Sequence, residues 1–248
     1  VIKEFGDKKA KFITSISMFY DLEDPCGFAK DIECVLHDEG IWVFEQSYLP
    51  SMIKTNSFDT ICHEHLEFYS LKQVMYIAEK AGLKIIDVEL NDINGGSFSI
   101  VAAKKSSSRK PNERLINNML KKEVEMGLDG TEVFTSFFER VETQKNNLLN
   151  FLQEVKSSNK KIFGLGASTK GNVLLQYYDI GPNLLPAIAD VNEDKFNKFT
   201  PGSLIPIISE VEALEQKPDY FLVLPWHFRD FFISNPAFKG TTLVFPLP

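Results

Sequence analysis

The segment Cys62-His63-Glu64-His65 carries the side chains whose types and spacing have the clearest chemical use in this sequence. An imidazole that titrates near neutral pH, next to a carboxylate, suits the removal of a proton from a carbon beside a carbonyl. Zinc binding is a second interpretation, but adjacent residues of an extended loop point in opposite directions, and no C-x-x-C or H-E-x-x-H spacing occurs. A structural histidine is the third. The segment therefore predicts a proton-abstracting base that acts on a small polar substrate, and no metal site.

A glycine-rich segment, Gly164-Leu165-Gly166-Ala167-Ser168-Thr169-Lys170-Gly171-Asn172, is the second candidate site. It follows an apolar run and opens a predicted helix, the context in which exposed backbone N–H groups bind phosphate. Its spacing matches neither the G-x-G-x-x-G fingerprint nor a Walker A loop. The side chains of Ser168, Lys170 and Asn172 add donors that suit a pyrophosphate or a sugar. A tight turn in which glycine serves only packing is the alternative.

Three shorter features complete the set of candidates. The segment Asn94-Gly95-Gly96-Ser97 is typical of a hairpin turn, and its glycines would also let the backbone and the first asparagine approach a ligand closely. Tyr48 and Tyr69 are candidate hydroxyl donors to an oxyanion, or half-buried aromatic residues. Residues 201–207 and 224–228 follow predicted strands of the C-terminal part, so we expect them to line a crevice between domains.

The rest of the sequence predicts the elements that must position these residues. Apolar, β-prone runs predict buried strands, and a 3.6-residue apolar repeat after a capping residue predicts a helix. In the first half these are a strand over residues 11–20, a helix over 24–38 ended by Gly40, a strand over 41–45, a long loop over 46–69, a helix with a capping box over 70–82, and strands over 83–90 and 97–103. The last two strands are expected to close a mixed sheet.

The second half predicts a separate α/β arrangement. A polar stretch over residues 104–112 marks a boundary, and helices are expected over 113–126 and 131–157, the longer one connecting two domains. Strands follow over 161–164, 185–190, 220–224 and 242–245, with helices over 170–178 and within 207–214. This alternation implies a small, doubly wound parallel sheet.

Composition excludes several classes of protein. The chain has 248 residues, of which 44% are hydrophobic and 25% charged, as in a globular protein with one large or two smaller domains. A net charge of -7 argues against a broad nucleic-acid-binding surface. No apolar run reaches the roughly 18 residues of a membrane span. Three cysteines, an odd number, fit a reducing compartment, so we expect a cytoplasmic protein.

Four segments together resemble the sugar C-methyltransferases that act on nucleotide-linked deoxy-keto-sugars. They are residues 58–66, 94–97, 166–172 and 201–207, and their order and spacing follow that family over essentially the entire chain. The resemblance implies a transferase of deoxysugar biosynthesis that uses S-adenosyl-L-methionine to methylate C3 of a 4-keto-deoxysugar through an enolate. The sugar would be carried on a nucleotide, dTDP being the one expected. By position, His65 would be the base and Glu64 its polar partner.

The resemblance also implies roles for other residues. Residues 166–172 would hold the diphosphate of the nucleotide-sugar or face it across a crevice. We expect the substrate-binding residues to be Tyr48, Asn94, Ser97, Ser168, Lys170, Gly171 and Asn172. The strand that ends near residue 20 is the candidate for the late part of the cofactor wall, which assigns Phe19 and Tyr20 to cofactor binding. Cys62 departs from the family, which usually has tyrosine there, so this protein must replace any part that hydroxyl plays.

Members of that family have a zinc-binding N-terminal domain, a middle S-adenosylmethionine domain and a C-terminal Rossmann-like domain. The resemblance implies that residues 1–104 are the second half of a Rossmann-like methyltransferase domain, 105–158 linker and bridging helices, and 159–248 the C-terminal domain. The zinc cysteines, the Gly-rich first loop and the ribose-binding acidic residue of the family are not found before residue 11. We therefore expect an incomplete S-adenosylmethionine site, zinc only in the part missing here, and a sheet edge open to self-association.

Two other functions stay open. A non-catalytic nucleotide-sugar-binding or partner subunit of the same fold would lack the methyl-donor half. An NAD-dependent oxidoreductase would use residues 164–171 and needs an acidic residue after the next strand to hold the ribose. Asp190, about twenty residues further on, is at a suitable distance for that role.

Overall fold

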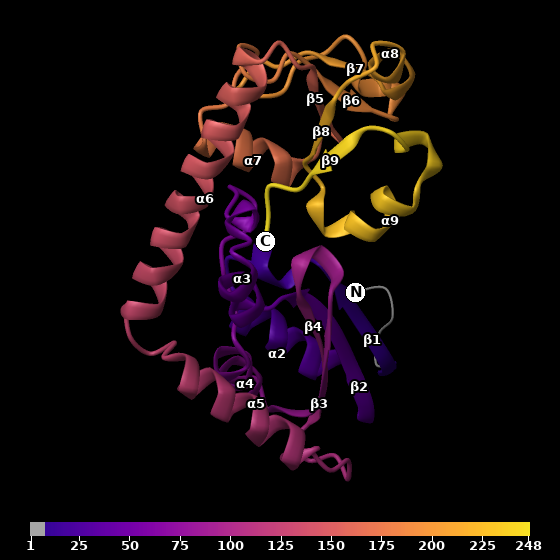
Figure 1. Cartoon of the computed structure of the whole chain (residues 1–248). Helices are drawn as coiled ribbons and strands as arrows, with labels where there is room; N and C mark the ends of the chain where they lie inside the picture. The colour runs from indigo at the N-terminus through magenta and orange to yellow at the C-terminus, as the bar shows by residue number, and fades with distance from the viewer. Residues whose placement is uncertain (1–7) are drawn as a thin grey trace. The chain divides into compact units, whose positions relative to one another are not determined.

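The structure, a computed structural model, describes residues 8–248, which form two compact units (Figure 1). The first unit contains the described residues up to Lys54 and His63–Phe134, and the second contains Thr55–Cys62 and Thr135–Pro248. The chain therefore visits the second unit briefly and returns to the first at His63. The family-based domain ranges 1–104, 105–158 and 159–248 stay predictions.

A four-stranded mixed sheet, in the order β1-β2-β4-β3, forms the centre of the first unit. β1 (Ala10–Ile16) runs parallel to β2 (Leu36–Ser47), and β4 (Ser97–Lys104) runs antiparallel to both β2 and β3 (Leu83–Asn91). The predicted mixed sheet is confirmed. Among the described strands β1 lies at an edge and exposes two large apolar side chains, Phe12 and Ile16. Self-association through this edge stays a prediction.

Strand β2 begins earlier than predicted, because the helix before it is shorter. Helix α2 covers Pro25–Val35, and the chain enters β2 directly at Leu36. The prediction that Gly40 ends this helix is wrong, since Gly40 lies inside β2. A Cβ at this position would come within 2.9 Å of the Ala10 carbonyl oxygen. Glycine there lets β1 and β2 lie close together.

The predicted loop over residues 46–69 is partly helical. It contains helix α3 (Leu49–Thr55) and the 3-10 turn η2 (Phe58–Thr60), both shorter than the span over which an apolar period becomes visible. Helices α4 (Leu71–Lys80) and α5 (Glu113–Met126) lie where the sequence predicts them.

The start of helix α4 is held by side chains from two helices. Ser70 and Gln73 form the predicted capping box. The carboxylate of Glu123, from α5, also accepts the N–H groups of Leu71 over 2.7 Å and Lys72 over 3.2 Å. This carboxylate is buried, and a negative charge at a helix N-terminus stabilises the helix dipole. Glu123 therefore joins α5 to α4.

A five-stranded parallel sheet, in the order β7-β6-β5-β8-β9, forms the centre of the second unit (Figure 1). The strands are β5 (Ile162–Leu165), β6 (Ile188–Asp190), β7 (Ile207–Ser209), β8 (Tyr220–Val223) and β9 (Thr242–Val244). In chain order the first strand is central, the next two extend one side and the last two the other. This confirms the predicted doubly wound sheet and puts its switch point between β5 and β8.

Four α helices accompany this sheet: α6 (Glu132–Ser157), α7 (Thr169–Tyr177), α8 (Glu210–Glu215) and α9 (Arg229–Ser234). Alternate residues of β5 and β8 belong to two separate apolar clusters, so both faces of the sheet are covered. The sequence did not predict β7, because three residues are too few for a strand pattern. Its last residue, Ser209, already caps α8 by accepting the Glu212 N–H.

Candidate active site

The carboxyl ends of β1 and β2 bring several predicted site residues to one edge of the first sheet. β1 is followed by the turn η1 (Phe19–Asp21), and Ser47, at the end of β2, pairs with Ser97 at the start of β4. The N–H of Tyr48 donates to the Gly96 carbonyl over 3.1 Å. Ligand crevices of α/β proteins form outside the carboxyl ends of parallel strands. We call this edge of the first unit the β1/β2 edge.

His65 lies at the β1/β2 edge. Its ring, half-buried, lies 4.3 Å from the ring of Tyr20 between centroids. The backbone N–H groups of Leu66 and Glu67 both donate to the Tyr20 carbonyl, over 3.0 and 3.1 Å. The two residues predicted for base and cofactor roles, 45 positions apart, are thus neighbours. Ring contact and backbone bonds together fix the position of the imidazole.

A carboxylate whose charge interacts with that of His65 is Asp21, an exposed residue that the sequence reasoning missed. Partial desolvation, and then the charge of Glu64, raise the pKa of Asp21, while the charge of His65 lowers it. Glu64 itself is 63% exposed, with its Oε1 4.0 Å from Nε2 of the exposed His63. Its predicted role as the partner of His65 stays a prediction. Its position in the turn η1, which follows β1, is a signal that could have found it.

Tyr48 and Tyr69 are core residues. The Tyr48 hydroxyl donates to Glu123 Oε1 over 2.8 Å, and burial followed by this carboxylate raises the Tyr48 pKa. Because this hydroxyl already has a buried acceptor, the structure gives Tyr48 a structural role in place of the predicted substrate contact. Tyr69 is likewise buried, and burial is the main cause of its raised pKa.

Phe19 also belongs to the core. Its ring is 1% exposed and packs against Trp42, Phe44 and Tyr69, with centroids 5.2 to 5.6 Å apart. The side chain therefore does not make the predicted cofactor contact, since it faces the interior of the unit. Of the two residues expected to contact S-adenosylmethionine, only Tyr20 keeps its side chain at the β1/β2 edge. That the S-adenosylmethionine site is incomplete in this chain stays a prediction.

The turn over residues 94–97 joins β3 to β4 as the predicted hairpin. The Ser97 hydroxyl donates to the Ile93 carbonyl over 2.9 Å and is buried, so it closes the turn. Asn94 adopts a left-handed conformation with φ of 56° and is half-buried. The predicted substrate contact of Asn94 stays a prediction. The hydroxyl of Ser97 already donates a hydrogen bond within the turn, so it is not free to bind substrate in this structure.

Gly96→Ala is expected to destabilise the protein by about 2 kcal/mol. Gly96 has φ of +124°, which L side chains rarely adopt, and an added Cβ would lie 2.5 Å from the Cβ of Ser51. Urea unfolding would measure the loss. Gly127→Ala is the matched control, because Gly127 has φ of +77° with nothing within 4 Å. We expect it to cost about 1 kcal/mol. Equal losses would contradict the steric part of the argument.

The glycine-rich turn of the second unit lies at the switch point, after β5. The Ser168 hydroxyl accepts the Gly171 N–H over 3.0 Å and caps α7, and Asn172 is half-buried in the same first turn. A Cβ at Gly166 would lie 2.7 Å from Pro225, and one at Gly171 would lie 2.8 Å from Leu224. Both glycines are therefore needed for the close approach of the segment after β8.

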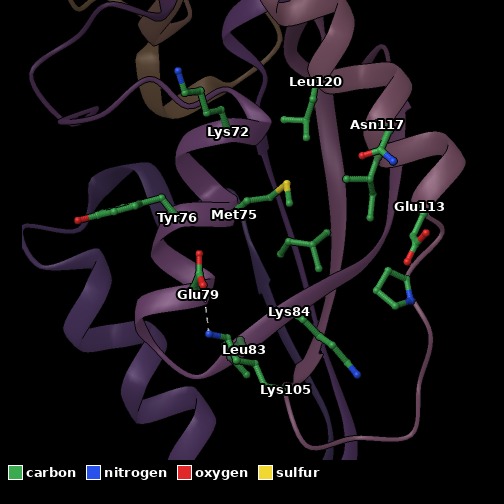
Figure 2. A pocket seen from close by; sticks show the side chains of 13 residues that line it. Lys72, Met75, Tyr76, Glu79, Leu83, Lys84, Lys105, Glu113, Asn117 and Leu120 are labelled. Carbon is green, nitrogen blue, oxygen red and sulfur yellow. Dashed lines mark hydrogen bonds and ion pairs between the residues drawn. The ribbon is translucent and has the colours of Figure 1, made fainter.

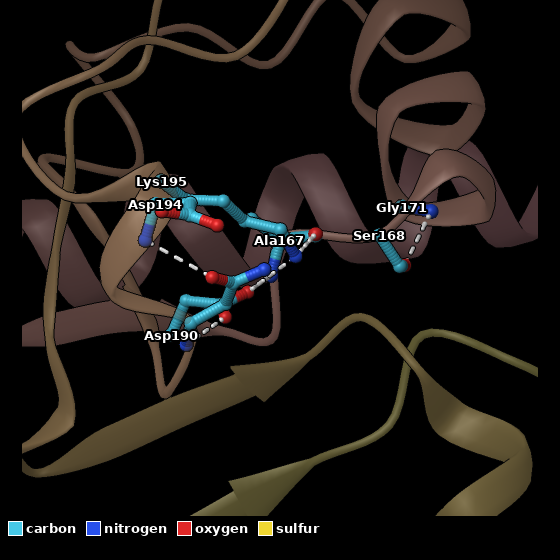
Figure 3. A network of polar contacts seen from close by, with 7 residues as sticks. Ala167, Ser168, Gly171, Asp190, Asp194 and Lys195 are labelled. Carbon is cyan, nitrogen blue, oxygen red and sulfur yellow. Dashed lines mark hydrogen bonds and ion pairs between the residues drawn. The ribbon is translucent and has the colours of Figure 1, made fainter.

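A polar network holds this turn to the end of β6 (Figure 3). Oδ2 of Asp190 accepts the Ala167 N–H over 2.8 Å and lies 3.1 Å from Lys195 Nζ, which also donates to the Ala167 carbonyl. Oδ1 accepts the Asn192 N–H over 2.8 Å. The Asp190 carboxylate thus orders the turn. An NAD-dependent oxidoreductase would need the same carboxylate to bind the ribose, and no observation favours that role.

A polar cluster lies beside the turn, formed by the buried residues Asp59 and Trp226 and the half-buried residues Lys170 and His227. Asp59 is 1% exposed, and its Oδ2 accepts the Trp226 indole N–H over 2.7 Å. Burial raises the pKa of Asp59, while Lys170 and this hydrogen bond lower it. Burial lowers the pKa of Lys170, and the charge of Asp59 opposes that shift. The sequence reasoning missed Asp59 and Trp226, which are 167 residues apart.

The pKa of His227 predicts a loss of stability in acid. Burial, and then the charge of Lys170, lower it from 6.5 to about 4. Below pH 6.5 the unfolded chain therefore binds a proton here that the folded chain does not. We expect the free energy of unfolding to keep its highest value above pH 6.5, where His227 is neutral in both states. It should fall by about 1–2 kcal/mol as the pH drops toward 4. Urea unfolding at two pH values should show a smaller fall for His227→Gln. An unchanged fall would contradict this assignment.

Residues 201–207 lie away from the glycine-rich turn, and their predicted place in a crevice between domains stays a prediction. The side chain of Gln176, in the last turn of α7, donates to the Pro201 carbonyl over 3.0 Å. Lys170 lies in the first turn of the same helix. The segment therefore lies at the opposite end of α7, because it leads into the amino end of β7 and does not follow a carboxyl end. The segment 224–228, which follows β8, does lie at the switch point.

Three cavities within the described residues lie away from the predicted site residues. One of about 600 Å³ lies between α4, β3 and α5 in the first unit, with Glu79 and Lys105 paired beside it (Figure 2). Two of about 390 and 670 Å³ lie in the second unit. No predicted site residue lines any of the three.

Over residues 8–248, no group of three or more His, Cys, Asp or Glu is placed to hold a metal ion, and no helix is long and apolar enough to cross a membrane.

Comparison with known proteins identifies the family. A model of the C-methyltransferase C-terminal domain matches residues 92–248. The C-methyltransferase NovU of Streptomyces niveus is 29% identical over 242 residues, covering 96% of this chain. The chain spans 57% of the length of that relative.

Two solved structures resemble parts of the chain. LepI in complex with SAM is 17% identical, with a TM-score of 0.34 over 40% of this chain and 27% of that one. TnmH is 16% identical, with a TM-score of 0.32 over 40% and 31% of the two chains. The match to the family model covers most of the chain, and the chain therefore belongs to the C-methyltransferase family.

Proposed function

We propose that this protein is part of an S-adenosylmethionine-dependent C-methyltransferase in which His65 removes a proton from a nucleotide-linked keto-sugar. The observation that carries the proposal is the position of His65. Its ring lies against Tyr20 at the β1/β2 edge, where α/β enzymes bind their ligands. Membership of the C-methyltransferase family supports the reaction class.

The proposed step is deprotonation at C3 of a 4-keto-deoxysugar. The C4 carbonyl makes the C3–H bond acidic, so the imidazole of His65 can take the proton while the bonding electrons form the enolate. Asp21, an exposed carboxylate whose charge interacts with that of His65, is proposed to favour the imidazolium that results. S-adenosylmethionine, when bound, supplies an electrophilic methyl group. The residues at the β1/β2 edge thus prepare the carbon nucleophile, with Glu64 and Asn94 as further polar groups for the sugar.

The nucleotide part of the substrate is proposed to bind at the glycine-rich turn. Helix α7 begins there, and the backbone N–H groups of a helix N-terminus favour a phosphate. Lys170, Gly171 and Asn172 lie in this first turn, and Ser168 caps it. Because Asp59 offsets the charge of Lys170, the backbone contributes much of the attraction for a dTDP diphosphate.

Solvent exchange tests the proposal without the methyl donor. The chain is incubated in D₂O with a dTDP-linked 4-keto-deoxysugar, and the C3 proton signal is followed by NMR. We expect its loss to be at least about 100-fold faster than in buffer alone. Tight binding in calorimetric titration with no exchange would overturn the catalytic proposal. It would favour the non-catalytic nucleotide-sugar-binding subunit.

A further inference from the structure

The side chain of Gln46, near the end of β2, is buried without any hydrogen bond. It is 1% exposed, and neither its amide nitrogen nor its amide oxygen has a partner within residues 8–248. Over the same residues, no other buried amide or carboxylate lacks a partner at both of its polar atoms. A carboxamide offers two donors and one acceptor, and burying it unpaired lowers the stability of the fold. The group therefore calls for an explanation outside folding.

Gln46 lies where the carboxyl ends of the two parallel strands of the first unit meet. Ile16, the last residue of β1, pairs with Glu45 in β2, and the Glu45 carbonyl accepts the Ser17 N–H over 2.8 Å. Gln46 is the next residue of β2, so it is the first position beyond the paired length of β1. It therefore belongs to the β1/β2 edge, where α/β proteins bind ligands and where His65 lies.

The neighbours of the Gln46 side chain are apolar. Side chains alternate between the two faces of a strand, so Gln46 shares a face with Phe44 of β2, and across the sheet it pairs with Phe98 of β4. Both rings are buried. An apolar environment strengthens any hydrogen bond that the amide makes with a ligand. Because no bond holds the amide in its present position, turning it toward a ligand at the edge breaks none.

The enolate of the proposed reaction needs a hydrogen-bond donor. When His65 takes the C3 proton, the electrons of the C3–H bond form a C3–C4 double bond, and the π electrons of the carbonyl move to the C4 oxygen. That oxygen becomes negatively charged, and a donor placed at it lowers the barrier. Tyr48, a hydroxyl that the sequence suggests for this purpose, donates to Glu123 instead.

We propose that Gln46 is a substrate-contacting residue whose side-chain N–H donates to the C4 oxygen of the keto-sugar. The inference rests on the proposed deprotonation at C3. It explains why an unpaired amide lies at this end of β2, since its partner is the substrate and not another part of the chain. Gln46 takes up no proton in this account; it stabilises the charge that proton removal creates.

The first experiment observes the amide directly and needs no turnover. The side-chain NH₂ signals of the chain labelled with ¹⁵N-glutamine are recorded by NMR, and the pair that disappears in Gln46→Met belongs to Gln46. We expect this pair to shift when a dTDP-linked 4-keto-deoxysugar is added and to stay in place with dTDP alone, because dTDP has no ketone. The pair from Gln144, in α6 of the second unit, is the reference and should not move.

The second experiment compares stability with deuterium exchange at C3. Gln46→Met keeps the length of the side chain and removes its polar atoms. We expect the urea midpoint to rise by about 0.5 M, because an apolar group replaces an unpaired buried amide. Exchange at saturating keto-sugar should slow by about 100-fold or more. Gln144→Met is the matched control: its Oε1 is also buried without a partner, but it lies in α6, so the exchange rate should be unchanged.

The outcomes separate this inference from the proposed function. If Gln46→Met lowers the urea midpoint, or exchanges as fast as an active unaltered chain, the amide is structural and the inference is overturned. A shift of the Gln46 signals by S-adenosylmethionine and not by the keto-sugar overturns it as well. If the keto-sugar moves these signals but the unaltered chain shows no exchange, the contact stands and the catalytic proposal falls. Should Gln46→Met fail to fold, Gln46→Leu gives the same readouts.

Discussion

His65→Ala is expected to slow deuterium exchange at the sugar C3 by about 10²–10⁴-fold. The imidazole is the only group in the proposed mechanism that takes up the proton, and alanine cannot take its place. The affinity for the nucleotide-sugar should stay within about threefold, since the diphosphate is proposed to bind at the α7 turn. Exchange by NMR and calorimetric titration measure the two quantities on the same samples.

The neighbouring residues provide the controls. His63 is 87% exposed, so His63→Ala should lower the rate by less than about threefold. Glu64→Gln keeps the size of the side chain and removes its charge, and we expect an effect between those of the two histidine variants. If His65→Ala abolished binding while the remaining bound fraction exchanged normally, His65 would be a binding residue and the proposed base would lie elsewhere.

Glu123→Leu is expected to lower the free energy of unfolding by about 3–5 kcal/mol. The substitution removes three hydrogen bonds at once, those from the Tyr48 hydroxyl and from the N–H groups of Leu71 and Lys72. Each donor left unpaired in the interior costs about 1–3 kcal/mol. Helix α4 also loses the negative charge at its N-terminus. Urea unfolding followed by circular dichroism measures the change.

Tyr48→Phe measures one of these three hydrogen bonds separately from the cap of α4. It removes one of the three bonds and leaves the carboxylate with both backbone donors, so we expect a loss of about 1 kcal/mol. Glu123→Gln keeps an acceptor oxygen without the charge and should fall between the two. If Glu123→Leu cost less than Tyr48→Phe, the cap of α4 would contribute nothing and the interpretation of Glu123 would be wrong.

The longer helices and strands of this fold can be predicted from the sequence, because their apolar patterns and capping residues lie within a short stretch of the chain. The apolar alternation of helices and strands after residue 160 predicts the doubly wound sheet, and the capping box at Ser70 and Gln73 predicts the start of α4. Short helices and strands cannot be predicted in this way. The three residues of β7 and the seven of α3 are too few to establish a period. Gly40 led to a wrong helix end for another reason. It lies inside β2, where the absence of a side chain lets β1 and β2 lie close together.

The polar contacts of the candidate site are set by topology and not by spacing. Asp59 meets Trp226 across 167 residues, and the carbonyl of Tyr20 meets the chain after His65. In the sequence, Asp59 is one acidic residue between Phe58 and Thr60, and no nearby residue indicates its partner. The rule that ligands bind at carboxyl ends of parallel strands could have singled out Asp21, which the sequence analysis missed. It does not predict that Phe19, two residues earlier, faces the core.

The early segment Thr55–Cys62 has a consequence during synthesis of the protein. The ribosome releases this segment before all of His63–Phe134, yet Phe58 finds its partner Tyr178 only once α7 has emerged. A nascent chain at that stage therefore presents a large apolar side chain that a chaperone can bind. A gene fragment that starts at Thr135 would lack Phe58 altogether, leaving a vacancy against Tyr178 in a core that no later residue fills. Expression of the C-terminal part alone should therefore include residues 55–62, joined by a designed linker.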